Sequence, residues 1–98
     1  MNKKEFFEAV ARRADVDRRT AKRVLRAVFS PVRGEGVLAD TLELNERVTI
    51  TGFGTFEVRQ RESRKYHDPR TGRSRRLRAT YVAAFRPGVP LKDRIRIM

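Results

Sequence analysis

The residues best suited to chemistry in this chain are basic side chains gathered in one segment. Residues 59–78 hold nine arginines and lysines but only two acidic residues, Glu62 and Asp68. Guanidinium and ammonium groups at this density bind phosphates and other anions through charge and hydrogen bonds. Asp68-Pro69-Arg70-Thr71-Gly72 in the middle is a turn sequence, because proline presets φ and glycine tolerates a positive φ. The segment therefore predicts a basic ribbon or a mobile loop that turns near Pro69.

The charge of the whole chain agrees with an anionic partner. Its 98 residues include 24 lysines and arginines against 12 acidic residues, a net charge of +12 with an isoelectric point near 11.5. So large a charge repels itself unless a polyanion neutralises it. Nucleic acid is the leading candidate, ahead of an anionic membrane surface or an acidic protein.

Catalysis has little support in the residue types. Cysteine is absent, and His67 is the one histidine, with only Glu62 and Asp68 near it in the sequence. A metal site or a nucleophile with its base cannot be assembled from these residues. Gly52-Phe53-Gly54 is predicted to be a strand turn and not a nucleotide loop. We therefore expect no catalytic, cofactor-binding or metal-binding residues and no small-molecule substrate.

The elements that must position the basic segment begin with helices. Apolar residues recur at helical spacing over 3–14, and again from Ala21 to Val32. Asp17 is a good N-cap for the second helix. Pro31 predicts that this helix kinks or stops near Ser30, since proline in a helix interior costs about 3 kcal/mol. Residues 37–42 are predicted to add a further helical turn.

From Arg47 onward the period changes from helical to alternating. The alternation predicts strands beginning at Arg47, over 56–61 and from Arg73 to Ala84, with a closing helix over 91–97. The fold class is thus α+β: a helix pair, a three-stranded antiparallel sheet with a long protruding β-ribbon arm, and a short C-terminal helix. From Arg59 to Pro69 an extended arm covers about 33 Å at ~3.3 Å per residue.

The chain length is consistent with one domain, 1–98, made of a helical dimerisation part (1–46) and a sheet part (47–98) with the arm at about 59–78. Phe53, Phe56 and Phe85 lie in or beside strands with apolar neighbours, which favours core packing over a base-stacking platform. Without the arm, about 80 residues remain, a marginal size for a core. We therefore expect an intertwined dimer that shares one core.

Several linked motifs resemble one family. These are Met1-Asn2-Lys3-Lys4-Glu5 at the start, Gly52-Phe53-Gly54-Thr55-Phe56 with Glu57-Val58-Arg59, Arg64-Lys65 with Asp68-Pro69-Arg70-Thr71-Gly72, and Phe85-Arg86-Pro87-Gly88 with Leu91-Lys92-Asp93. Together they resemble the bacterial histone-like HU proteins and integration host factor over nearly the whole chain.

The resemblance implies an architectural protein that bends and compacts double-stranded DNA. Pro69 would wedge between base pairs at the arm tip, an action for which this family is a known example. The DNA-binding residues would be Lys3, Arg59, Arg61, Arg64, Lys65, His67, Pro69, Arg70, Arg73, Arg75, Arg76, Arg78, Arg86 and Lys92. The partner subunit would be an identical chain or a paralogue. The location would be the cytoplasm and its nucleoid, with no membrane partner, since no apolar run approaches about 18 residues.

Three departures from the family pattern stand out. The segment between the second helix and the first strand is longer than usual and contains Pro31. His67-Asp68 replaces the usual Arg-Asn before the tip proline, so an acceptor-only carboxylate stands where an amide could donate. Ala83 stands where HU proteins commonly have proline.

Other functions remain open at this point. A sequence-selective DNA-bending factor like integration host factor is the nearest alternative, and an RNA-binding module is a more distant one. A membrane-surface binder is weaker still, because the charge lies on a strand-like arm and not on an amphipathic helix. A second basic surface, formed by Arg18, Arg19, Lys22, Arg23 and Arg26, is either a solvated helix face or a surface for longer DNA.

Overall fold

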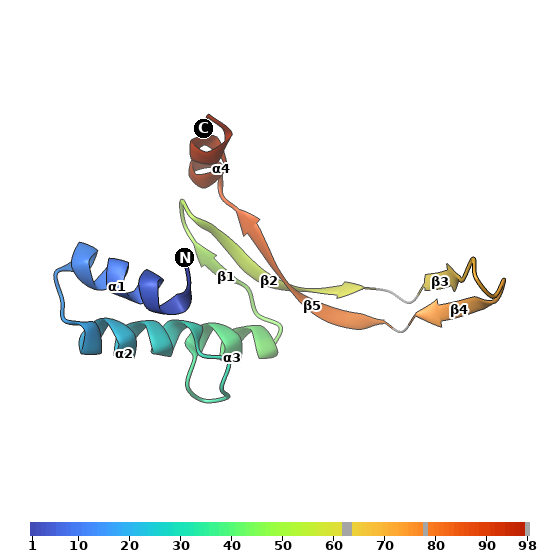
Figure 1. Ribbon diagram of the computed structural model, residues 1–98, viewed down its shortest axis with the longest axis horizontal. Helices are drawn as coiled ribbons and strands as arrows, with labels where there is room; N and C mark the ends of the chain where they lie inside the picture. Colours follow the sequence, from blue (N-terminus) through green and yellow to red (C-terminus); the bar gives the residue numbers. More distant parts are fainter. Residues whose placement is uncertain (62–63, 78, 98) are drawn as a thin grey trace. The chain divides into compact units, whose positions relative to one another are not determined.

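The computed structural model describes residues 1–61, 64–77 and 79–97 and divides the chain into two compact units, 1–44 and 45–98. The first unit is helical, with α1 (Lys3–Ala14), α2 (Arg18–Phe29) and α3 (Val37–Glu43). The second contains β1 (Val48–Ile50), β2 (Gly54–Arg61), β3 (Arg64–His67), β4 (Ser74–Leu77), β5 (Thr80–Pro87) and α4 (Val89–Arg96) (Figure 1). The α+β class is confirmed, while the assignment of 1–98 to one functional domain stays a prediction.

Local capping explains where the first two helices begin. Asn2 accepts the backbone N–H of Glu5 at 2.8 Å, and Asp17 accepts that of Thr20 at 2.6 Å. Each cap satisfies a donor that the first helical turn leaves without a partner. Asp15 ends α1 in the left-handed conformation, with φ 56°. The predicted cap at Asp17 and the predicted α1 are both confirmed.

The segment after α2 is held by polar contacts. Helix α2 ends at Phe29, as Pro31 predicts, and the Ser30 hydroxyl donates to Glu35 at 2.8 Å. The Asp40 carboxylate accepts the N–H of Gly34 at 3.1 Å. Gly36 is required because a Cβ there would lie 1.9 Å from the Ser30 carbonyl oxygen. The predicted helical turn after this loop is confirmed as α3.

The three-stranded sheet has the order β1-β2-β5, with both pairs antiparallel. β3 and β4 form a separate two-stranded ladder. The pair Arg64↔Leu77 lies three residues further along each strand than the pair Arg61↔Thr80. The two ladders therefore have the same register. The described residues of the basic segment, 59–61 and 64–77, therefore form a ribbon with a turn, and not a loop without regular structure.

The prediction of one continuous strand from Arg73 to Ala84 is wrong. Two strands, β4 and β5, occupy this range, and Ala79 between them belongs to neither. β5 is supported by a three-stranded sheet, whereas the β3–β4 ladder has two strands only. A two-stranded ribbon twists more strongly and is marginally stable without further support, so alternation alone does not set where pairing is interrupted.

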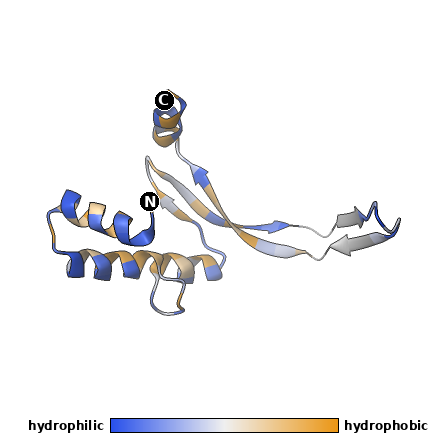
Figure 2. Ribbon diagram, in the orientation of Figure 1, coloured by the Kyte–Doolittle hydropathy of each residue, from blue (hydrophilic) through white to orange (hydrophobic). Residues whose placement is uncertain are grey.

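The described residues bury few apolar side chains. Their buried hydrophobic residues are Ala11 and Ala21, whereas Val24, Phe29 and Phe53 are about half exposed. Figure 2 shows apolar residues along α2 and α4 among hydrophilic ones. The expectation that Phe53, Phe56 and Phe85 form a core is therefore only partly met. The three rings cluster, but Phe53 and Phe85 are 47% and 39% exposed.

Candidate nucleic-acid interface

Strand alternation gives the sheet two chemically different faces. Phe56 lies opposite Phe85 in the β2–β5 register, with ring centroids 4.8 Å apart, and marks the apolar face. Side chains alternate along a strand, and directly opposed residues share a face. Glu57, Arg59 and Arg61 therefore lie on the other face of β2. Arg86 joins them from β5 because it is opposite Thr55. We call this the polar sheet face.

Glu57 is the centre of an ion-pair cluster on the polar sheet face. Its Oε1 accepts the Nε and Nη2 of Arg59 at 3.1 and 3.0 Å and lies 3.4 Å from the Nε of Arg86. Its Oε2 lies 3.8 Å from the Nε of Arg47. One carboxylate thus contacts guanidinium groups from β2, from β5 and from the residue just before β1.

The electrostatics of this cluster keep Glu57 ionised. The hydrogen bond from Arg59 is the largest influence and lowers the pKa of Glu57 below its ordinary value; partial burial opposes the shift. The charges of Arg86, Arg59 and Arg47 lower the pKa further. At neutral pH the cluster therefore carries three positive charges and one negative charge.

The tip of the β3–β4 ribbon is a closed turn. The N–H of Asp68 donates to the Arg73 carbonyl at 2.9 Å, and that of Gly72 donates to the Asp68 carbonyl at 2.8 Å. Gly72 has φ +73°, a conformation that side chains other than glycine rarely adopt. Pro69 is exposed at this turn. The structure therefore presents the proline ring to solvent at a hydrogen-bonded turn.

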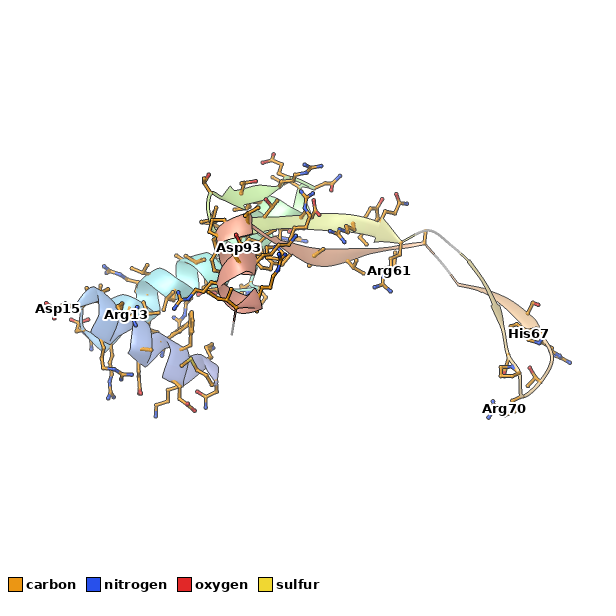
Figure 3. The ribbon with its side chains drawn as sticks, turned by 90° about the horizontal axis from the view of Figure 1, so that it is seen from above. Arg13, Asp15, Arg61, His67, Arg70 and Asp93 are labelled. Carbon is orange, nitrogen blue, oxygen red and sulfur yellow. The ribbon has the colours of Figure 1, made fainter. Side chains whose placement is uncertain are left out.

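Two side chains of the tip turn, those of Asp68 and Thr71, accept hydrogen bonds from its backbone. Its Oδ1 accepts the backbone N–H of Arg70 at 2.9 Å, while the Thr71 hydroxyl accepts that of Arg73 at 3.4 Å. The carboxylate thus accepts from the backbone donor two residues ahead, as in an Asx turn. Figure 3 shows Arg70 at the end of the turn, with His67 close to it on the ribbon.

The structure brings only part of the predicted DNA-binding set together. Arg59, Arg61 and Arg86 share the polar sheet face, and His67, Pro69, Arg70 and Arg73 lie at or beside the tip turn. Lys92 is exposed on α4, and Lys3 belongs to the other unit, on α1. The β3–β4 ladder contains Arg64, Lys65, Arg75 and Arg76. Arg78 lies outside the described residues.

Sequence reasoning missed Arg47 and Glu57. Alternation along β2 could have placed Glu57 beside Arg59, because residues two apart share a face. Arg47 gives no such signal, since it precedes β1 and meets Glu57 only through the β1–β2 register.

The second basic surface, on α2, is partly neutralised. Arg18 pairs with Glu8 at 3.8 Å and Arg26 with Glu35 at 3.5 Å. Exposed pairs of this kind contribute little to stability. They leave the choice between a solvated helix face and a surface for longer DNA open.

The part of the chain that the structure describes contains no cluster of three or more His, Cys, Asp or Glu side chains that could hold a metal ion. Over the same residues, no helix combines the length and apolar character needed to span a bilayer.

The fold and the site define a class: a small basic α+β protein with a cationic sheet face and a two-stranded basic ribbon ending in an exposed proline. Comparison with known proteins narrows the class. The family described as bacterial DNA-binding protein matches residues 1–96, and the chain belongs to this family.

Individual relatives are similar to this chain over nearly its full length. The chain is 38% identical over 95 residues to DNA-binding protein HU-1 of Halalkalibacterium halodurans, covering 97% of this chain and 99% of that one. It is 36% identical over 96 residues to DNA-binding protein HU of Geobacillus stearothermophilus, covering 98% and 100%. Among solved structures, the Anabaena HU–DNA cocrystal structure matches with a TM-score of 0.82 at 33% identity, covering 97% of each chain. HU from Thermotoga maritima matches with a TM-score of 0.66 at 27% identity, covering 97% and 98%.

Proposed function

We propose that this protein is an architectural double-stranded DNA-binding protein that bends and compacts DNA and catalyses no reaction. One observation carries the proposal: an arginine-rich sheet face and a basic two-stranded ribbon keep one strand register, and the ribbon ends in an exposed proline. Membership of the bacterial DNA-binding protein family and similarity to an HU solved with DNA support it. The proposal includes a location on the nucleoid, in the cytoplasm, and the family membership supports it.

The cationic side chains act chiefly on the DNA backbone. Arginine donates to phosphate oxygens in a fixed fork, and such contacts position a protein without reading sequence. The ribbon lies in the minor groove, where A·T and T·A pairs present the same acceptors. Little sequence preference and a strong dependence on salt follow from this mode of binding.

Pro69 supplies the bend. An apolar ring at a closed turn enters a base step with little loss of conformational freedom, and wedges of this kind kink the duplex. Unstacking costs a few kcal/mol per step and is offset by the additional protein surface that a bent duplex contacts.

The protein acts as a dimer. Val24 and Phe29 on α2 are 54% and 50% exposed, and Phe53 beside the sheet and Phe85 on β5 are 47% and 39% exposed. A chain that buries so little apolar surface alone is stabilised when a partner covers it. An identical chain is the simplest partner, and a paralogue is the alternative. The melting temperature should therefore rise with protein concentration, and a folded monomer in sedimentation at micromolar concentration would contradict the dimer.

A gel-shift series tests the function. The protein should bind linear, nicked and four-way-junction DNA, with tighter binding to the nicked and junction forms because they are already easy to bend. With about 6–10 phosphates neutralised, affinity should fall by on the order of 10³–10⁵ between 50 and 200 mM salt. A flat salt dependence would exclude the basic surface as the contact. Footprinting on random and genomic DNA separates this function from a sequence-selective factor, and equal affinity for A-form RNA would favour an RNA-binding module.

A further inference from the structure

An acidic side chain at the centre of a DNA-binding face needs an explanation. Glu57 lies on the polar sheet face with Arg59 and Arg86, where a carboxylate by itself repels phosphate. Its side chain is only 12% exposed, whereas those of Arg59 and Arg86 are each 55% exposed and that of Arg47 is 71% exposed. An approaching phosphate therefore meets the guanidinium groups before the carboxylate.

The atoms in contact show how the arginines are oriented. In all three ion pairs an Nε atom is among the closest to Glu57, at 3.1 Å for Arg59, 3.4 Å for Arg86 and 3.8 Å for Arg47. A guanidinium has five N–H donors, and the Nε edge uses at most two of them. Each arginine thus keeps at least three donors for another acceptor. The carboxylate restrains one edge of each group and leaves the rest available.

We propose that Glu57 is a positioning residue of the DNA-binding face, which holds the Nε edges of Arg47, Arg59 and Arg86 so that their terminal amino groups are presented to DNA phosphates. The inference rests on the proposed function and adds Arg47 to the residues that contact DNA. Arginine side chains otherwise lose much rotamer freedom when they bind, and a receptor whose groups are already held loses less.

Positioning and simple charge predict opposite signs for one substitution. Glu57→Gln removes a negative charge from the face, so charge alone strengthens DNA binding. If Glu57 positions the arginines, the E57Q variant must instead order them when it binds DNA. Ordering one such side chain weakens affinity by a factor of about two to ten. Three side chains at the low end of this range together give about tenfold, and this is the loss that we expect.

Glu46→Gln is the matched control. Glu46 is exposed, precedes Arg47 in the chain, and loses the same charge on substitution. The affinities of wild type, E46Q and E57Q are measured for one nicked duplex at one salt concentration. E46Q should bind as tightly as wild type or more tightly, and E57Q should bind about tenfold more weakly than wild type. If E57Q binds as tightly as E46Q, the positioning role is refuted while DNA binding stands. If the wild type itself does not bind DNA, the proposed function fails instead.

A second measurement does not depend on how the variants fold. In the free wild-type protein, the Nε–H proton of Arg59, which donates to Glu57 at 3.1 Å, should exchange with water more slowly than that of Arg61, as followed by NMR. Arg61 lies on the same face of β2 and serves as the internal reference. Equal exchange for Arg59 and Arg61 overturns the inference. Glu57→Asp keeps the charge but retracts the carboxylate, and it should retain more affinity than E57Q; a loss equal to that of E57Q would also count against positioning.

Discussion

Asp68→Asn should tighten DNA binding, because it removes a negative charge beside Pro69, the proposed wedge, without opening the turn. Asp68 Oδ1 accepts the N–H of Arg70 at 2.9 Å, which holds the carboxylate next to Pro69. Asparagine has the same Oδ1 acceptor, so the turn keeps its cap. The other carboxylate oxygen becomes an amide nitrogen, which donates to phosphate where the carboxylate could only accept.

The size of the effect follows from Coulomb's law. A carboxylate about 5 Å from a phosphate charge is repelled by roughly 1–3 kcal/mol for effective dielectric constants between those of water and a protein surface. Removing this repulsion should tighten binding by about five- to a hundredfold per arm at low salt. The gain should shrink as salt rises, since the Debye length is only about 8 Å at physiological ionic strength.

Fluorescence anisotropy on one short duplex at two salt concentrations measures this gain. Asp15→Asn is the matched control, because it removes the same charge at an exposed residue in the turn after α1. Asp15 has φ 56°, which asparagine tolerates well, so the fold is preserved. Asp68→Ala separates charge from turn geometry, since it removes the carboxylate and the hydrogen bond to Arg70 together.

The reasoning is refuted if D68N binds DNA no more tightly than wild type while D15N is also unchanged. That result would mean that the Asp68 carboxylate faces away from phosphates in the bound state. A gain in D68N that is independent of salt would equally contradict an electrostatic origin.

Pro69→Ala should reduce the bend angle far more than the affinity, because phosphate contacts supply most of the binding energy; energy transfer between duplex ends measures the angle, and an unchanged angle excludes the wedge. Asp17→Ala should cost about 1 kcal/mol of stability and lower the melting temperature by about 4–8 °C, since the cap on Thr20 is lost, whereas Asp17→Asn should be nearly neutral. Stability should also fall in acid: the pKa of Glu57 is lowered by Arg59, so its contribution is complete above its ordinary value of 4.5 and is lost as the pH falls below it. In E57Q this part of the acid limb of a denaturation curve should flatten, and an unchanged acid limb would show that Glu57 is not the group that titrates.

The element types and many of their ends followed from the sequence, because they depend on neighbours a few residues apart. Helical spacing over 3–14, the cap at Asp17 and the stop imposed by Pro31 are all local effects, and the structure agrees with each. The sequence alone also predicts the basic composition of 59–78 and the turn at Pro69. The conformation of the long segment after α2 could not be predicted from the sequence. Its contacts from Ser30 to Glu35 and from Gly34 to Asp40 depend on how the loop folds back.

The tertiary structure decided which charges meet. Arg47, Glu57 and Arg86 are ten and twenty-nine residues apart in the sequence, and only the order β1-β2-β5 and its register bring them onto one face. A shift of one residue in either pairing would turn a partner to the opposite face. Local pattern says which face of its own strand a residue occupies, but the register depends on pairing between distant segments. For that reason the sequence predicted a basic surface, and the sheet determined that a carboxylate lies among its arginines.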